Sequence, residues 1–320
     1  MSGTGRVIEA AGVTKRFAGI VALDGVDLAV DEGERVGLIG PNGAGKTTFF
    51  NCLLGVLRAD GGTVELDGRD VTRLPVHQRA RLGIGRTFQR IELFPDSTVR
   101  EHLLIAERVK RRTGRLWKDV VGLGRPNADE IATCDEVLEL LGLADLADEP
   151  IERLSLGQGR LVEVGRALMT DPRLLLLDEP SSGLDRSETA ALAETLGEVQ
   201  TQRGFAILLV EHDVELVASF TSRCYLLDFG RLIAEGPTAT LMASAEMRHA
   251  YLGELDPATD AGEGGGEATA RDAGSDAAVT SDADADTAGA SEDPDPADPA
   301  DEPDSEAPDL RPPAADEEPS

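Results

Sequence analysis

The chain has 320 residues, of which 41% are hydrophobic and 28% are charged, and its formal net charge is −29. This length suits one large domain or two modest ones. No stretch approaches the roughly 18 uncharged apolar residues of a membrane span, and the N-terminus lacks an apolar signal core, so we expect a cytoplasmic chain. The three cysteines are far apart and fit no metal spacing. A nucleic-acid binder usually needs a basic face, which the overall charge does not support.

The first strands are predicted at residues 6–17 (RVIEAAGVTKRF) and 21–30 (VALDGVDLAV), where apolar and polar residues alternate. Alternation is typical of strands with one exposed face, so we expect an antiparallel sub-sheet here. Continuous apolar runs follow at 35–40, 174–180 and 205–212. Such runs suit strands buried on both faces of a parallel sheet. Helical spacing follows each of them, at 46–57, 186–203 and 213–219.

Residues 40–47 (GPNGAGKT) fit the pattern G-x-x-x-x-G-K-[ST] between a predicted strand and a predicted helix, which is the context that the motif requires. Its glycines permit backbone conformations closed to other residues, so that successive N–H groups can cradle phosphate oxygens. We expect Lys46 to reach the β- and γ-phosphates, Thr47 to ligate Mg²⁺, and Thr48 to contact the α- or β-phosphate. The predicted loop comprises Gly40, Pro41, Asn42, Gly43, Ala44, Gly45, Lys46, Thr47 and Thr48.

Asp178 and Glu179 are the first polar residues after four leucines in LLLLDEP. Working residues of parallel sheets lie at the carboxyl ends of strands, which places this pair near the phosphate loop. Alone, the pair could be a solvated strand end. Behind a phosphate loop, we interpret Asp178 as a Mg²⁺ ligand and Glu179 as the group that orients, or takes a proton from, the attacking water.

The composition changes sharply near residue 254. Residues 254–320 contain 22 acidic residues and two arginines, or about −20 of the net charge. They hold too few large apolar side chains to offset the entropy of ordering, so we predict a disordered acidic tail over 256–320. Solvation and charge repulsion are its simplest roles, and docking of a partner is the alternative.

Further motifs occur in an order that resembles the ATP-binding subunits of ABC transporters. The resembling motifs are GRTFQ around Gln89 (the Q-loop), LSLGQ at 154–158 (the LSGGQ signature), SSGLD at 181–185 (the D-loop) and the switch histidine His212. The resemblance implies an α/β P-loop NTPase fold at 5–255, with a RecA-like core, an antiparallel β-subdomain and a helical subdomain at about 90–172. The disordered acidic tail would follow.

The resemblance also implies a role for each motif. Gln89 would ligate Mg²⁺ or the attacking water, and His212 would bond the γ-phosphate and hold Glu179. Phe17, at the end of the first strand, would stack on adenine. These residues would act on ATP, with Mg²⁺ as the metal.

The family works as a head-to-tail pair, so the signature would act on a neighbour's nucleotide. Ser155, Gly157 and Gln158 keep the groups that would contact that γ-phosphate, although Leu156 replaces the usual glycine. Asp185 would help the two subunits meet, or would cap the helix at 186–203, or both.

Finer matches resemble the ATP-binding subunits of branched-chain amino acid importers, a group that tolerates a large residue at position 156. These are IGPNGAGKTTFFNCLLG (39–55), GIGRTFQRIELFPDSTVREHLL (83–104) and the ending YLG (251–253). The basic stretch within 108–130 would face the membrane or the permease, or would be a solvated helix.

That resemblance implies an importer with several partners. They are two membrane permease subunits, a second identical or different ABC ATPase subunit and an extracytoplasmic solute-binding protein, with no nucleic acid. The chain would be peripheral at the cytoplasmic face of the membrane. An importer of urea, amides or other amino acids is the alternative, and a non-transport ABC ATPase is less favoured. A purely regulatory nucleotide binder is disfavoured because Glu179 and His212 are both present.

Overall fold

A computed structural model describes residues 5–87, 97–111 and 126–252, except for the side chains of 107–111 and 252. Gln89, the basic side chains of 108–118 and the expected tail at 256–320 therefore lie outside the described residues. Of the helices that the structure describes, none is long and apolar enough to cross a membrane.

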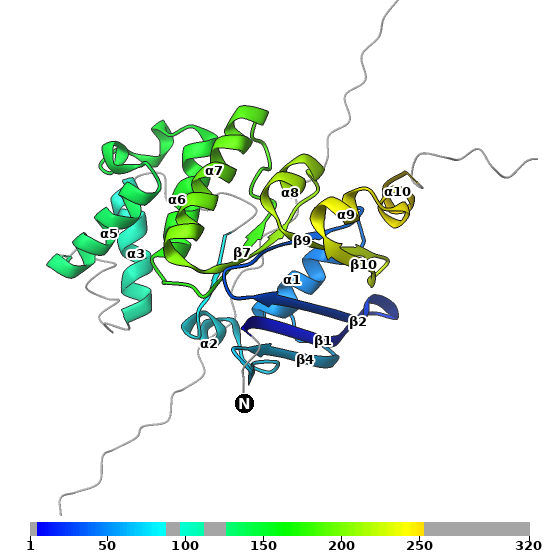
Figure 1. Ribbon diagram of the computed structural model, residues 1–320. Helices are drawn as coiled ribbons and strands as arrows, with labels where there is room; N and C mark the ends of the chain where they lie inside the picture. Colours follow the sequence, from blue (N-terminus) through cyan, green and yellow to red (C-terminus); the bar gives the residue numbers. More distant parts are fainter. Residues whose placement is uncertain (1–4, 88–96, 112–125, 253–320) are drawn as a thin grey trace, which may run out of the picture. The chain divides into compact units, whose positions relative to one another are not determined.

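An antiparallel sheet of four strands, in the order β2–β1–β4–β5, contains both alternating segments of the N-terminal region (Figure 1). Its strands are β1 (Arg6–Phe17), β2 (Ile20–Asp31), β4 (Gly61–Leu66) and β5 (Arg69–Asp70). Both turn residues between β1 and β2, Ala18 and Gly19, have positive φ, as the tight turns that match strand twist require. The predicted antiparallel sub-sheet is confirmed.

A second sheet, in the order β10–β9–β3–β8–β7–β6, contains the three continuous apolar runs. Its strands are β3 (Arg35–Ile39), β6 (Ile84–Arg86), β7 (Leu174–Asp178), β8 (Ala206–Val210), β9 (Arg223–Asp228) and β10 (Arg231–Pro237). All neighbouring pairs are parallel except β9 with β10. The predicted parallel sheet is confirmed, and the carboxyl ends of β3, β7 and β8 meet at one edge.

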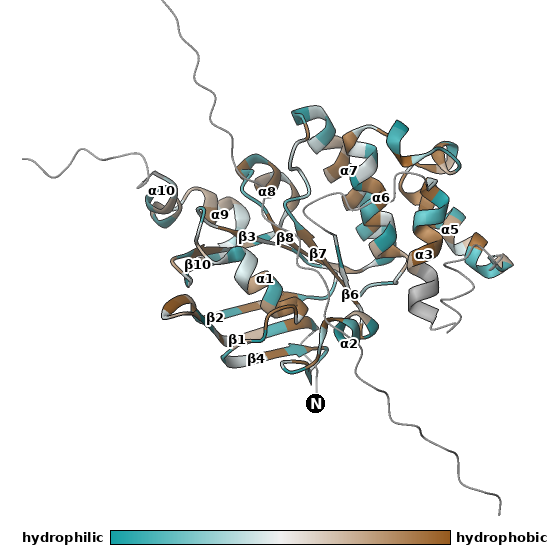
Figure 2. Ribbon diagram, turned by 180° about the vertical axis from the view of Figure 1, so that it is seen from behind, coloured by the Kyte–Doolittle hydropathy of each residue, from teal (hydrophilic) through white to brown (hydrophobic). Residues whose placement is uncertain are grey.

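All four leucines of strand β7 are buried, because both faces of this strand are covered. Successive side chains on a strand point to opposite faces. Leu175 and Leu177 join one buried cluster, whereas Leu174 and Leu176 join another, and all four are fully buried. Burying each leucine contributes about 1.5–3 kcal/mol. Figure 2 shows the resulting apolar band along β7 and β8.

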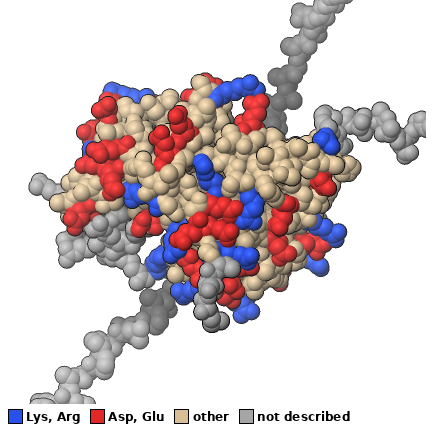
Figure 3. All heavy atoms as spheres, in the orientation of Figure 1, with Lys and Arg blue, Asp and Glu red and all other residues tan. Residues whose placement is uncertain are grey.

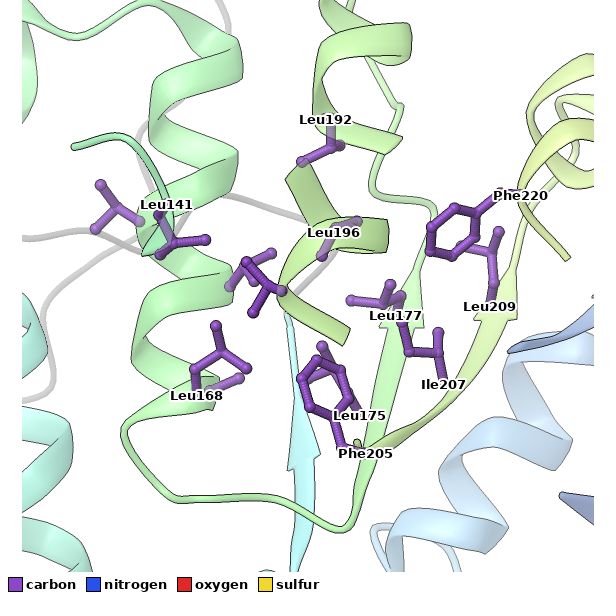
Figure 4. Close-up of a cluster of buried hydrophobic side chains, with 14 of the residues drawn as sticks. Leu141, Leu168, Leu175, Leu177, Leu192, Leu196, Phe205, Ile207, Leu209 and Phe220 are labelled. Atoms are coloured by element: carbon purple, nitrogen blue, oxygen red, sulfur yellow. The ribbon is translucent and has the colours of Figure 1, made fainter. Parts of the chain in front are cut away.

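Helices cover the two faces of the parallel sheet differently. On one face, side chains of α7 such as Leu192 and Leu196 pack over β7 and β8 (Figure 4). On the other face, Phe49 and Leu53 of α1 lie in one cluster with residues of both sheets. Helix α1 spans Lys46–Leu54 and α7 spans Arg186–Arg203. Two further helices are α6 (Leu156–Leu168) and α8 (Val214–Phe220).

The helices predicted at 186–203 and 213–219 have the expected bounds within one residue, whereas the helix predicted at 46–57 is shorter. Helix α1 ends at Leu54 rather than at residue 57, because Gly55 adopts the left-handed conformation that terminates helices. The remaining helices are α2 (Val76–Arg81), α3 (Val99–Arg111), α5 (Ala128–Leu140), α9 (Thr238–Met242) and α10 (Ala245–Leu252), with short 3₁₀ turns at Ala144–Leu146 and Ile151–Arg153. Helices α3, α5 and α6 pack together.

Candidate nucleotide-binding site

The phosphate loop joins the end of β3 to the start of α1. Gly40 has a φ of 154° and Gly45 has a φ of 103°. At both residues the loop backbone lies close to a neighbouring strand. A Cβ atom on Gly40 would lie 2.1 Å from the carbonyl oxygen of Leu227, and one on Gly45 would lie 2.7 Å from that of Ala22. Only glycine therefore fits these positions, and the loop is held between β9 and β2.

The first turn of α1 presents its N–H groups toward the loop. Gly45 is the N-cap, and no side chain caps the helix. The first N–H groups of a helix have no acceptor within the helix and carry the positive end of its dipole. Together with the loop amides, they form a site suited to phosphate oxygens.

Lys46 lies inside the loop rather than in solvent. Its Nζ donates hydrogen bonds to the carbonyl oxygens of Gly40, at 2.6 Å, and Pro41, at 3.0 Å. Burial lowers the pKa of Lys46, while the charges of Glu179 and Asp178 act in the opposite direction. Its ammonium group is thus oriented by the loop and lies in the field of the two carboxylates.

The acidic pair follows strand β7. Burial raises the pKa of Asp178, and the neighbouring charge of Glu179 raises it further. Glu179 has a φ of +48°, which is uncommon for a residue with a side chain, and its N–H donates to the Val210 carbonyl at 2.8 Å. A backbone outlier at a strand end is typical of functional sites, where the surrounding structure holds the strain.

His212 follows the neighbouring strand β8 and faces the acidic pair. Its Nδ1 lies 4.0 Å from Oε1 of Glu179, and its side chain is 59% exposed. Glu211, which sequence reasoning missed, is fully buried and accepts hydrogen bonds from the N–H groups of Ser181, at 2.9 Å, and His212, at 3.2 Å. One buried carboxylate therefore holds the starts of the D-loop and the switch-histidine loop.

A cavity of about 410 Å³ opens in front of the phosphate loop. Its lining consists of Ile20, Val21, Ala22, residues 42–48, Glu179, Phe229 and Gly230. Ile20, Val21 and Phe229 are exposed apolar side chains, and sequence reasoning did not find them. The sequence signal for Phe229 was a phenylalanine next to glycine in DFGR at 228–231, a pattern typical of a turn that leaves the ring in solvent.

Among the described residues, Phe17 is not part of this lining. It pairs with Ile20 across the β1–β2 turn, so it lies beside the cavity. The residue is 42% exposed, and the Lys15 ammonium lies 5.4 Å from the ring centroid. Stacking of Phe17 on adenine stays a prediction.

The signature residues lie at the start of α6 and do not line the cavity of their own chain. The Ser155 Oγ accepts the N–H of Gln158 at 3.2 Å, and the Gln158 side chain accepts the N–H of Ser155 at 2.9 Å. This capping box fixes the helix start. Leu156 is exposed, and its Cδ2 lies 3.0 Å from where Gly183 would carry a Cβ. The signature residues are thus separate from the cavity beside the phosphate loop of the same chain.

Asp185 caps α7. Its carboxylate accepts the N–H groups of Ser187, at 2.7 Å, and Glu188, at 2.8 Å, and these bonds lower its pKa. The predicted capping role is confirmed, while the role at a subunit interface stays a prediction. Arg160, which lies in α6 just after the signature, connects this helix to the D-loop, because its Nη2 donates to the Ser182 carbonyl at 3.2 Å.

The oxygen atoms near Lys46 fit a Mg²⁺ ion bound with a nucleotide. Asp178 and Thr47 supply a carboxylate and a hydroxyl, which are ligand types that Mg²⁺ uses. Within the described ranges, no group of three or more His, Cys, Asp or Glu could hold a metal alone. Such a site suits an ion that takes its other ligands from phosphate and water. Gln89, the third predicted metal residue, lies outside the described residues.

The phosphate loop, its lysine and the acidic pair at the end of a neighbouring parallel strand define a P-loop nucleotide hydrolase. The family model described as ABC transporter matches residues 23–182. The chain belongs to the ABC transporter ATP-binding family and is an ABC-type ATPase.

Curated relatives cover most of the chain. BraF, a high-affinity branched-chain amino acid transport ATP-binding protein of Pseudomonas aeruginosa, is 38% identical over 78% of this chain and 98% of its own length. LivG of Escherichia coli, with the same description, is 38% identical over 76% and 96%. A probable LivG of Archaeoglobus fulgidus is 36% identical over 80% and 99%.

Solved structures share the fold. MJ1267, an ATP-binding cassette of an ABC transporter in its ADP conformation, has a TM-score of 0.70 and 32% identity, and covers 78% of this chain and 99% of its own. A nucleotide-free cassette from an ABC transporter has a TM-score of 0.67 and 30% identity, over 79% and 96%. The predicted P-loop fold with its antiparallel β-subdomain and helical part is confirmed.

Proposed function

We propose that this chain is the ATPase subunit of an importer of branched-chain amino acids. The observation that carries the proposal is the agreement of BraF and LivG relatives, from bacteria and an archaeon, over nearly their whole lengths. Their printed names give branched-chain amino acid transport as the process. The domain at 5–255, the helical subdomain at about 90–172 and the disordered tail at 256–320 are part of this proposal.

The phosphate loop is the ATP-binding half-site of the proposed enzyme. The amides of residues 42–48 bind the β- and γ-phosphates, and Thr48 contacts the α- or β-phosphate. Lys46 exchanges its bonds with the Gly40 and Pro41 carbonyls for bonds to phosphate oxygens. Thr47, Asp178 and Gln89 hold Mg²⁺, which when bound neutralises charge on the phosphates. Phe17 stacks on adenine.

Glu179 and His212 complete the hydrolytic half of the site. Glu179 orients the attacking water or accepts its proton, and His212 holds Glu179 and bonds the γ-phosphate. The 4.0 Å separation of their side chains supports this division of roles. Gln89 reports the nucleotide state to the membrane subunits.

A second ATPase subunit, identical or different, supplies the other half-site. Ser155, Gly157 and Gln158 of one subunit contact the γ-phosphate bound by the other. The exposure of Ser155 and its place outside the chain's own cavity support this arrangement. The MJ0796 cassette, 26% identical with a TM-score of 0.60, is described as a dimer bound to ADP and Pi.

The wider complex contains two permease subunits and an extracytoplasmic solute-binding protein. The chain is then peripheral at the cytoplasmic face of the membrane. We propose no nucleic-acid partner, because acidic and basic side chains are interspersed on the face in Figure 3. ATP hydrolysis would drive import through conformational coupling to the permeases.

The proposal is tested by uptake of labelled leucine, isoleucine, valine and urea in a strain that lacks this gene. We expect uptake of the three branched-chain amino acids to fall and to return when the gene is restored. Normal uptake of these three together with loss of urea uptake would identify an amide importer instead. Normal uptake of every solute tested would contradict an import function.

A further inference from the structure

Helix α10, the last one in the described part of the chain, reaches the first residue of the phosphate loop. The Tyr251 hydroxyl accepts the N–H of Gly40 at 3.0 Å, a contact between residues 211 positions apart. The tyrosine side chain is half-buried and packs against the apolar cluster that also covers β7 and β8. Its hydroxyl is therefore held in place by a packed ring, rather than by a mobile surface chain.

Gly40 receives contacts that determine the loop position. A Cβ atom on Gly40 would lie 2.1 Å from the Leu227 carbonyl oxygen, and the φ of this residue is positive, so no side chain fits here and side-chain packing cannot hold the residue. Its carbonyl accepts the Nζ of Lys46 at 2.6 Å, and its N–H donates to Tyr251. Tyr251 and Lys46 thus bond the two polar backbone atoms of the same residue.

The outer side of the loop is open beside α10. A cavity of about 340 Å³ separates the two, lined by Pro41, Asn42, Gly43, Ala44, Asp228, Phe229, His249 and Ala250. Because this part of the loop faces space, packing against α10 does not hold it there. The hydrogen bond from Gly40 to Tyr251 joins α10 to the first residue of the loop.

We propose that Tyr251 is a positioning residue for nucleotide binding. Its hydroxyl fixes the Gly40 peptide, which sets the direction in which the loop leaves β3 and keeps the following amides ready for phosphate. A preformed anion site loses less entropy on binding than one that must be ordered by its ligand. The proposal rests on the proposed function of the phosphate loop.

Full-length wild-type protein, Tyr251→Phe and Tyr225→Phe provide a matched test, because these are the only two tyrosines. The Tyr225 hydroxyl accepts from Ala29 N–H, at 3.1 Å, and from Arg223, at 2.6 Å, and donates to the Ala29 carbonyl. Each variant loses one hydroxyl with ordered partners, but only Tyr251 contacts the loop. The readouts are the Kd for ADP by calorimetry, the KM and kcat for ATP, and Tm.

For Tyr251→Phe we expect the Kd for ADP and the KM for ATP to rise roughly fivefold to tenfold, about 1–1.4 kcal/mol, with kcat within about twofold. For Tyr225→Phe we expect a lower Tm with an unchanged Kd. An unchanged Kd in Tyr251→Phe, or an equal rise in both variants, would overturn the role of Tyr251. If the wild-type chain binds no ADP, the proposed function of the loop fails as well.

Discussion

The Nδ1 atom of His212 lies 4.0 Å from the Oε1 atom of Glu179, across the ends of the neighbouring parallel strands β8 and β7. The same imidazole nitrogen lies 3.8 Å from Oε2 of the buried Glu211. Glu211 also accepts the N–H of Ser181, two residues after Glu179. Glu179 and His212 are therefore connected through a third residue, Glu211, which contacts both of their loops.

Glu211→Ala is expected to lower both stability and turnover. The change leaves the N–H groups of Ser181 and His212 without their buried acceptor, which costs about 1–3 kcal/mol. The D-loop and His212 would then lose their fixed positions. Thermal unfolding and kcat measure the two effects. Glu215→Ala is the control, because that side chain is 77% exposed and pairs with an exposed arginine, so its loss should be nearly neutral. Identical behaviour of the two variants would contradict the positioning by Glu211.

Ser155 has two separable roles. Its hydroxyl caps α6, and replacing such a cap with alanine costs about 0.5–2 kcal/mol. We also propose that it contacts the nucleotide of a second subunit. Asparagine caps helices as well as serine does, so Ser155→Asn should keep Tm near the wild-type value while turnover falls, and Ser155→Ala should lower both. Wild-type turnover in Ser155→Asn would show that Ser155 acts only as a cap.

Asp178 should make the nucleotide-free protein less stable as pH rises. Burial and the Glu179 charge raise its pKa above the ordinary value of 3.8. The folded protein then binds this proton more tightly than the unfolded chain does. The stabilisation is complete below about pH 4 and is lost as pH rises through the raised pKa.

Asp178→Asn removes this pH dependence, because the amide does not ionise. Its Tm should therefore exceed the wild-type Tm at pH 7, with the difference shrinking toward pH 4, in buffer with EDTA and no nucleotide. Thermal unfolding across pH 4–8 measures this. Parallel pH profiles for the two proteins would show that Asp178 carries no unfavourable buried charge.

Contiguous features of the fold and site could be predicted from the sequence. The phosphate loop is a run of eight residues, so its glycines, lysine and threonine are close together in the sequence. The four consecutive leucines of β7 indicate a strand buried on both faces. The cap at Asp185 was predictable because the N–H groups that donate to its carboxylate lie within three residues. In each case the determining contacts are close in sequence.

Contacts distant in sequence were not predictable in the same way. Glu211 precedes His212, yet its role depends on Ser181, 30 residues earlier, and Tyr251 acts on a residue 211 positions away. The apolar rim of the cavity joins Ile20 and Val21 of β2 with Phe229 from the β9–β10 turn. A single sequence records no distance between such segments, so only the folded topology identifies these neighbours.

We propose above all that Glu179 promotes hydrolysis of ATP bound between the phosphate loop of one subunit and the signature residues of another. Glu179→Gln keeps the size of the side chain and removes its charge and basicity. The direct measurement is steady-state ATPase activity of this variant, together with its ATP affinity and its ATP-dependent dimerisation. We predict retained ATP binding, a stabilised closed dimer and turnover lowered roughly hundredfold or more. Turnover within about twofold of the wild-type rate would contradict the role of Glu179 and with it this account of the site.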